Sequence, residues 1–172
     1  DAHALMNDQM KAVLAKSAEL AGSDAFATDA GFEGMRENYT KERKFWNEGG
    51  PVMAKTVDEM FDGPMGEFKV RFYYPVEAEK LPAIVFIHGG GFVVGNPDTH
   101  DRVCRILAEK TGAAVVSVDY HLSPESKYPT NIKECALVAK YLHEHGEEKG
   151  IDGEDISFAG DSGGAVLSMA TN

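Results

Sequence analysis

The feature that most constrains this chain is the stretch Gly-Asp-Ser-Gly-Gly at residues 160–164. Residues 156–159 before it are mostly apolar, as in a buried strand, and residues 165–170 after it favour a helix. A backbone that passes from strand to helix so abruptly is crowded and strained, and glycines two positions before and after the serine provide the necessary room. The sequence therefore predicts a tight strand-to-helix turn that presents Ser162 at its apex, the geometry of a nucleophile elbow.

A second glycine-rich segment follows another apolar run. Residues 83–87 read Ala-Ile-Val-Phe-Ile, typical of a buried strand, and lead into His88 and the three glycines 89–91. Consecutive glycines let backbone amides converge on an anion, as an oxyanion hole for acyl transfer requires. A dinucleotide-binding loop would need a glycine at position 94, which is a valine, and an immediate helix. Together the two segments favour a catalytic serine over a glycine-rich turn with a structural serine.

A third stretch, residues 119–129, reads Asp-Tyr-His-Leu-Ser-Pro-Glu-Ser-Lys-Tyr-Pro. With the two glycine segments, in this order, it resembles the hormone-sensitive-lipase-like group of α/β-hydrolases, the bacterial family IV carboxylesterases, whose segment reads D-Y-R-L-A-P-E-x-x-x-P. His121 and Ser123 stand where that group usually carries Arg and Ala. The resemblance covers roughly residues 50 to 172, and it implies that Asp119 and Glu125 support the architecture.

The string Gly-Asp-Ser-Gly-Gly also surrounds the nucleophile of trypsin-like proteases. Those enzymes are paired antiparallel barrels whose histidine and aspartate precede the serine. This chain instead alternates short apolar strands with amphipathic helices, and the protease histidine motif A-A-H-C is absent. The sequence therefore argues against the protease interpretation.

The resemblance implies a role for the residues around the serine. Ser162 is the expected nucleophile, and the expected oxyanion donors are three backbone amides, those of Gly90, Gly91 and Gly163. Position 163 usually carries alanine in the family. Because the donor there belongs to the main chain, we expect glycine to preserve the chemistry.

Four further residues are expected to support the site structurally: His88, Gly89, Asp161 and Glu125. In α/β-hydrolases the triad histidine comes last in the chain, after the serine and the acid, so we interpret His88 as orienting the oxyanion loop. Asp161 is expected to hydrogen-bond locally within the elbow, and not to be the triad acid. Residues 164–172 contain no aspartate, glutamate or histidine. The triad acid and histidine are therefore expected on a C-terminal segment, in the same chain or as a separate one.

Periodicity divides the chain into a helical N-terminal segment, 1–47, and the first portion of a catalytic domain, 48–172. Apolar residues at helical spacing predict a first helix over 5–21 and a second one that continues towards the end of the segment. The family resemblance implies that these helices form a cap over the active site. The predicted caps and limits are Asn7 or Asp8 for the first helix, and Thr28 or Asp29 to Trp46 for the second.

The rest of the chain predicts an α/β fold. Strands that alternate with helices imply right-handed crossovers and a mostly parallel sheet with helices on both faces, here preceded by an antiparallel hairpin. The expected hairpin strands are 52–61 and 67–74, with a turn over 62–66. The expected later elements are strands 83–87, 113–118 and 155–160, helices 99–111 and 130–147, and a helix after Ser162. The expected buried stripe of helix 130–147 is Ile132, Cys135, Ala136, Ala139 and Leu142.

Composition excludes several classes of function. The net charge of −11 over 172 residues, without a basic run, argues against nucleic acid or an anionic membrane surface as partner. Cys104 and Cys135 fall on apolar helix faces and indicate no disulfide. His143 and His145 are two positions apart on a helix and cannot chelate together, so no metal site is expected. No apolar run is long enough to cross a membrane, and the cytoplasm is the default location.

The sequence is thus interpreted as part of a serine carboxylesterase that hydrolyses short- to medium-chain acyl esters through an acyl-enzyme on Ser162. The expected partners are a small-molecule ester and the C-terminal segment, and the sequence is compatible with a homodimer. No cofactor is implied. One alternative is a non-catalytic binding or regulatory protein on a truncated hydrolase scaffold. Another is an amidase or deacetylase on the same scaffold, because the acyl-transfer chemistry is shared.

Overall fold

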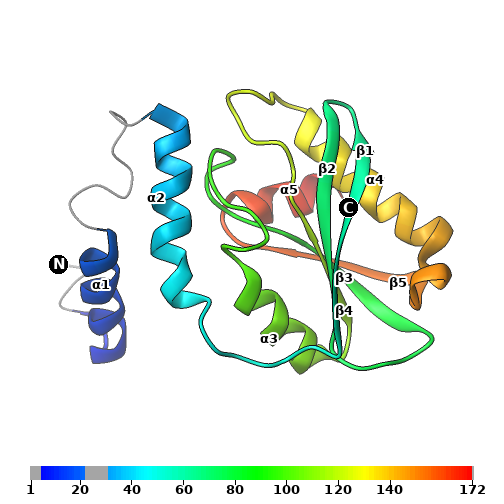
Figure 1. Cartoon of the computed structure of the whole chain (residues 1–172), viewed down its shortest axis with the longest axis horizontal. Coiled ribbons are helices and arrows are strands. Elements are labelled where there is room, and N and C mark those ends of the chain that lie inside the picture. The colour runs from blue at the N-terminus through cyan, green and yellow to red at the C-terminus, as the bar shows by residue number, and fades with distance from the viewer. Residues whose placement is uncertain (1–4, 22–30, 172) are drawn as a thin grey trace.

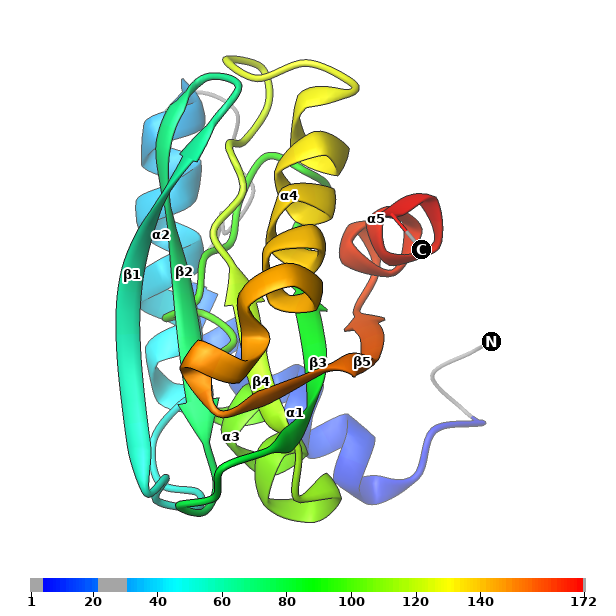
Figure 2. The same ribbon diagram turned by 90° about the vertical axis from the view of Figure 1, so that its right-hand side faces the viewer.

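The computed structural model describes residues 5–21 and 31–171. A five-stranded sheet lies at its centre, with helices on either side (Figures 1 and 2). The elements are α1 (Asp8–Ala21), α2 (Gly31–Trp46), β1 (Lys55–Gly63), β2 (Gly66–Tyr74), β3 (Leu81–Ile87), α3 (Asp101–Thr111), β4 (Ala114–Val118), α4 (Thr130–His145), the 3₁₀ helix η3 (Gly146–Lys149), β5 (Ile151–Gly160) and α5 (Gly163–Thr171).

The strand order in the sheet is β1-β2-β4-β3-β5. β1 and β2 form the expected antiparallel hairpin, and β2 also runs antiparallel to β4. β4, β3 and β5 are parallel, with Val85 of β3 opposite Val116 on one side and Phe158 on the other. The sheet is therefore mixed, and its parallel part carries the two glycine segments at its end.

The hairpin is tighter than the sequence predicts. β1 begins at Lys55 rather than at residue 52, and only Pro64 and Met65 separate the two strands instead of a turn over 62–66. Strand pairing continues as far as Gly63 opposite Gly66. Gly66 has a φ of 110°, which a glycine adopts at low cost, so the chain reverses within very few residues.

Two hydrophobic clusters lie on opposite faces of the sheet. The five residues of β4 are all buried, as expected for a parallel strand that is covered on both faces. α3 covers one face, while α4 and α5 lie together on the other (Figures 1 and 2). Each large apolar side chain that is fully buried contributes about 1.5–3 kcal/mol. The smaller cluster consists of Tyr73, Phe86, Cys104, Ala108 and Val115.

The buried face of α4 differs from the expected stripe. Cys135 and Leu142 are buried as expected, but Ala136 and Ala139 are only half-buried. The helix turns Asn131, Glu134 and Val138 inward instead. Glu134 is completely buried because it is paired: Oε2 accepts the amide of His121 at 2.8 Å, and Oε1 lies 2.7 Å from His121 Nδ1. Periodicity read from apolar residues alone could not reveal a buried carboxylate. The helix ends at His145, and η3 continues it.

The N-terminal helices lie beside the domain, with α1 on the outer side of α2 (Figure 1). Asn7 caps α1 as expected, since its side-chain oxygen accepts the amide of Met10 at 2.8 Å. Lys16 of α1 lies over the ring of Phe45 on α2, with 4.8 Å from the ammonium to the ring centroid. The predicted start of the second helix at Thr28 or Asp29 lies outside the described residues. Within the described part, no helix is long and apolar enough to cross a membrane.

Candidate active site

A crevice forms where β3 and β5 end. The two strands are neighbours, and their last residues pair with Ile87 opposite Gly160. The chain leaves β3 towards α3 on one face of the sheet and leaves β5 towards α5 on the other face. Connections that diverge in this way open a crevice at the carboxyl ends of the strands, where ligands bind in open α/β sheets. The structure thus brings the two predicted glycine segments together.

Ser162 lies at the apex of the turn between β5 and α5. Its side chain is exposed and its φ is 50°, a left-handed conformation that is strained for a residue with a side chain. The flanking glycines are required sterically. A Cβ atom on Gly160 would lie 2.5 Å from the carbonyl oxygen of Ile87, and one on Gly164 would collide with the same atom. The local geometry is that of the predicted elbow.

The loop after β3 carries further constrained glycines. Gly90 and Gly91 have φ values of 126° and 60°, and a Cβ on Gly90 would collide with the carbonyl of Val94. The amide of Val94 donates to the carbonyl of Gly90 at 3.1 Å, which closes the loop. Within residues 5–21 and 31–171, the amides of Gly90, Gly91 and Gly163 donate to no protein acceptor. The amide of Gly163 also stands at the N-terminus of α5, where the helix dipole favours negative charge.

His88 is fully buried beneath this loop. Its ring stacks on Tyr120 with 4.3 Å between centroids, and its Nδ1 lies 2.9 Å from the carbonyl oxygen of Gly89. Tyr120 in turn donates its hydroxyl to the carbonyl of His88 at 2.8 Å. Burial lowers the pKa of His88 to about 4, so the ring is neutral at pH 7. These contacts place His88 against the loop and Tyr120, away from the hydroxyl of Ser162.

Asp161 contacts residues outside the elbow, which the sequence does not predict. Its Oδ1 does not serve the elbow alone: it accepts the amide of Gly89 at 2.8 Å and lies 3.2 Å from His100 Nε2. Burial alone would raise the pKa of Asp161, but the hydrogen bonds from His100 and Gly89 outweigh it and lower that pKa to about 2. The ionised carboxylate therefore joins the elbow to the oxyanion loop. Sequence reasoning missed His100, and only its place at the start of a predicted helix after the glycine loop could have pointed to it.

Glu125 is paired with Arg36 of α2. Its carboxylate accepts two hydrogen bonds from the Arg36 guanidinium, at 3.1 and 2.6 Å, and this pairing lowers the pKa of Glu125. Arg36 also donates to the carbonyls of Val93 and Ser123, both at 2.9 Å. A single arginine thus links α2, the glycine loop and the 119–129 segment. No sequence motif marks Arg36, because its partners are distant in the chain.

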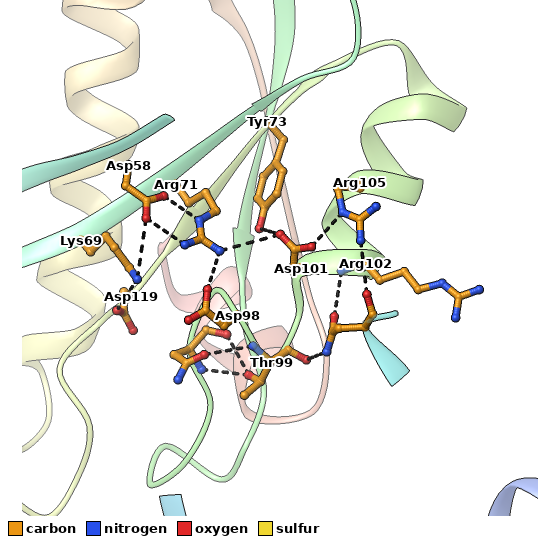
Figure 3. A network of polar contacts seen from close by, with 12 residues as sticks. Asp58, Lys69, Arg71, Tyr73, Asp98, Thr99, Asp101, Arg102, Arg105 and Asp119 are labelled. Carbon is orange, nitrogen blue, oxygen red and sulfur yellow. Dashed lines mark hydrogen bonds and ion pairs between the residues drawn. The ribbon is translucent and has the colours of Figure 1, made fainter. Parts of the chain in front are cut away.

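Asp119, the other supporting acid, lies outside the crevice. Its amide donates to the carbonyl of Lys69 at 2.9 Å, and its carboxylate lies 4.0 Å from Lys69 Nζ in the charged network of Figure 3. Burial raises the pKa of Asp119 to about 6. This side chain belongs to the hairpin end of the sheet rather than to the site.

A cavity of about 370 Å³ opens above the serine. Its floor is made by the elbow and the glycine loop, and its roof by α2, whereas α1 contributes none of the lining. The lining residues are Met35, Tyr39 and Arg43 of α2, and Gly90, Gly91, Val93, Val94, Asp161 and Ser162. The second N-terminal helix therefore contributes to the site, and the first lies behind it.

The remaining histidines and cysteines that the sequence analysis considered do not line this cavity. His143 and His145 are exposed, and both cysteines are buried and unpaired. Among the described residues, no group of three or more His, Cys, Asp and Glu side chains is arranged to hold a metal ion. In the same part of the chain, no histidine is hydrogen-bonded to the hydroxyl of Ser162.

Comparison with known proteins agrees with this geometry. The chain is 39% identical over 166 residues to the acetyl esterase of Salmonella agona, covering 96% of this chain and 50% of that protein. The hyperthermophilic esterase from the archaeon Pyrobaculum calidifontis matches with a TM-score of 0.80 and 39% identity, over 83% of this chain and 47% of that one. A thermostable carboxylesterase cloned from a metagenomic library matches with a TM-score of 0.81 and 34% identity, over 85% and 50%.

The chain thus spans about half the length of the curated relatives it matches. The model of the α/β-hydrolase fold family matches residues 84–172, which include both glycine segments and the 119–129 stretch. The expected resemblance is confirmed in sequence and in fold. This chain belongs to the α/β-hydrolase family, as a hormone-sensitive-lipase-like member related to esterases.

Proposed function

We propose that this chain supplies the nucleophile and the oxyanion hole of a serine carboxylesterase that acts on short- to medium-chain acyl esters. The observation that carries the proposal is the pairing of Ser162, exposed on a strained turn with a φ of 50°, with unbonded amides that border the same cavity. The amides that border this cavity belong to Gly90 and Gly91, and the unbonded amide of Gly163 follows Ser162 directly. The relationship to an acetyl esterase and to carboxylesterases supports the choice of substrate class.

The reaction would proceed in two halves. Ser162 Oγ attacks the ester carbonyl carbon while a histidine takes its proton, and the resulting oxyanion is stabilised by the three amides. The intermediate collapses, the histidine returns the proton to the departing alkoxide, and the acyl group remains on the serine. Water then attacks the acyl-enzyme with the same histidine as base, releasing the carboxylic acid and restoring Ser162.

We propose that this histidine and its acid partner lie on a segment that follows residue 172, here named the C-terminal segment. Two observations support a further strand next to β5. The outer side of β5 has no pairing partner among the described strands. Its second half carries Ile156 and Phe158, which are only half-buried although they pack on the main core. An unpaired edge of this kind is unfavourable in a parallel sheet.

We further propose that residues 1–47 act as a cap and residues 48–172 as the first portion of the catalytic domain. The contact of α2 with the cavity supports this division. Arg36 holds α2 against the glycine loop and the 119–129 segment, so substrate selection by the cap would depend on that contact. The size of the cavity, about 370 Å³, fits a short acyl chain.

The test uses the complete protein, meaning this chain together with the C-terminal segment. p-Nitrophenyl acetate and butyrate report turnover, and Ser162→Ala is expected to abolish it while leaving the thermal unfolding temperature nearly unchanged. Ser157→Ala is the matched control, because it removes a serine hydroxyl from the adjoining strand outside the cavity lining. Near wild-type turnover in Ser162→Ala would overturn the proposal.

The alternative functions give different results in the same assay. A non-catalytic binding protein would hydrolyse no ester and would not react with an organophosphonate probe. An amidase or deacetylase would react with the probe at Ser162, but its kcat/KM for N-acyl substrates would exceed that for the matching esters. Reaction with the probe therefore distinguishes the binding protein from both enzymes. The ratio of the kcat/KM values for N-acyl substrates and esters distinguishes the amidase or deacetylase from the esterase.

A further inference from the structure

His100 is a buried polar residue for which the proposed chemistry has no role so far. Only about 6% of its surface is exposed, although it directly precedes α3, where a side chain usually caps the helix. Its side chain makes no such cap. The ring turns instead towards the crevice, where Nε2 lies 3.2 Å from Asp161 Oδ1.

The surrounding turn fixes the position of this ring. Thr99 Oγ1 lies 2.9 Å from His100 Nδ1, so both ring nitrogens have a partner. Thr99 is itself held by Asn96: the Thr99 amide donates to Asn96 Oδ1 and the Asn96 amide donates to Thr99 Oγ1, both at 3.0 Å. Asn47, after α2, donates to the carbonyl of Thr99 at 2.9 Å. The sequence predicted Thr99 as the first residue of a helix, but this turn delays the helix until Asp101.

A charged network anchors the same turn to the sheet (Figure 3). Arg71 of β2 bonds to Asp98 at 2.6 Å and to both carboxylate oxygens of Asp58. The hydroxyl of Tyr73 donates to Asp101 at 2.9 Å, and Arg105 bonds to the other oxygen of Asp101 at 2.8 Å. The residues on both sides of His100 are therefore held by partners on β2 and α3.

We propose that His100 is a positioning residue that holds the Asp161 carboxylate across the crevice, so that the oxyanion loop stays aligned with the Ser162 elbow. Asp161 joins the elbow to Gly89, because its Oδ1 accepts a hydrogen bond from the Gly89 amide at 2.8 Å. The side chain of Asp161 is 52% exposed and would otherwise be free to turn towards solvent. The inference rests on the proposed esterase function. It adds to that function a residue that keeps the Ser162 elbow and the oxyanion loop aligned.

The expected consequence concerns turnover more than substrate binding. The donors at Gly90 and Gly91 follow Gly89 directly, so a shift of Gly89 moves them from the position of the oxyanion. A misplacement of about 1 Å costs on the order of a hundredfold in rate, and loss of a donor costs a similar factor or more. Because these contacts act in the transition state, kcat is expected to fall with little change in KM.

The test compares two variants that differ in where they place a donor. In His100→Gln, the side-chain amide nitrogen can reach the position of Nε2 and bond to Asp161. In His100→Asn, it corresponds to Nδ1 and faces Thr99. In the complete protein, we expect His100→Gln to retain kcat within about threefold, and His100→Asn and His100→Ala to lose about ten- to a hundredfold. His145→Ala, which removes an exposed histidine, is the control.

Rates are expressed per active site, by titration with an organophosphonate, so that partial unfolding of a variant does not count as lost turnover. Equal kcat values for His100→Gln and His100→Asn would overturn the positioning role, even if His100→Ala fails to fold. Wild-type kcat per titrated site in His100→Ala would do the same. A wild-type protein without esterase activity would instead contradict the proposed function itself.

Discussion

The two edges of the sheet differ in how they meet their surroundings. At the β1 edge, Asp58 pairs with Arg71 and Lys69, and both oxygens of Glu59 bind Lys149 at 2.7 Å. At the β5 edge, apolar side chains are half-buried, and the following helix exposes Val166 at 53% and Met169 at 76%.

Charged side chains are a common protection for a strand that ends a sheet, because they disfavour pairing with another chain. The β1 edge has this protection. The second half of β5 has the composition of an interior strand of a parallel sheet, which is normally covered on both faces. The β1 edge therefore has the charged side chains of an outer strand, while the composition of β5 favours the proposed pairing with the C-terminal segment.

The largest expected effect follows from dividing the complete protein after residue 172. Without a histidine to accept its proton, Ser162 is an ordinary hydroxyl, so esterase kcat should fall by about 10⁴-fold or more. Steady-state hydrolysis of p-nitrophenyl acetate measures this loss. Refolding the two pieces together should restore activity if the segment pairs with β5. Full activity of residues 1–172 alone would contradict the proposed difference between the two edges.

Glycine substitutions test the crowding at the β5 end. Gly164→Ala places a Cβ against the main chain of Ile87, which cannot move without disturbing the sheet. We expect it to lower the free energy of unfolding by about 3 kcal/mol or more. Gly66→Ala, in the hairpin turn, meets no atom within 4 Å and suffers only the strain of its φ of 110°. Its expected cost is about 1–3 kcal/mol. Urea unfolding of both variants measures the difference, and a smaller loss for Gly164→Ala contradicts the assigned geometry.

Added charge distinguishes a covered edge from an exposed one. Ser157 on β5 is exposed in this chain, as is Met60 on β1. In the complete protein, Ser157→Lys should lower stability by about 1–3 kcal/mol, because the C-terminal segment would enclose the ammonium group. Met60→Lys should change stability by less than about 0.5 kcal/mol. Thermal unfolding provides the comparison. Equal, small effects at both edges would show that nothing covers β5.

The smallest effect concerns pH at the hairpin end. The raised pKa of Asp119, about 6, means that the folded state holds this proton more tightly than the unfolded state does. The resulting stability is complete below about pH 4 and is lost as the pH rises through 6. Asp119→Asn should therefore gain about 1 kcal/mol relative to wild type between pH 4 and pH 8, a modest value because the side chain is 28% exposed. Urea unfolding at both pH values measures it, and a relative loss at pH 8 contradicts the burial argument.

The local features of the site could be predicted from the sequence, because they depend on residues close together in the chain. The glycines around Ser162 and after β3 predict a tight elbow and a loop with free amides, and the structure contains both. The partners Arg36 and His100 could not be found in this way. Arg36 lies 89 positions from Glu125, so only the folded chain brings them together.

The same distinction applies to the fold. The order of strands and helices follows from periodicity, but the burial of Glu134 depends on its pairing with His121, which lies in a loop. The sequence predicts a buried strand at residues 156–159, but Ile156 and Phe158 are only half-buried, because burial depends on the neighbouring strand as well as on composition. The observed ends of helices and strands differ from the predicted ones for similar local reasons, as at the tight turn between Gly63 and Gly66.

The most direct test of the account is to locate the nucleophile chemically. The complete protein is treated with a fluorophosphonate, digested, and its peptides are analysed by mass spectrometry. The account predicts one phosphonyl adduct, on Ser162, formed in parallel with the loss of esterase activity and absent from residues 1–172 alone. An adduct on another residue, or full ester hydrolysis by a protein whose Ser162 carries the adduct, would contradict the central claim.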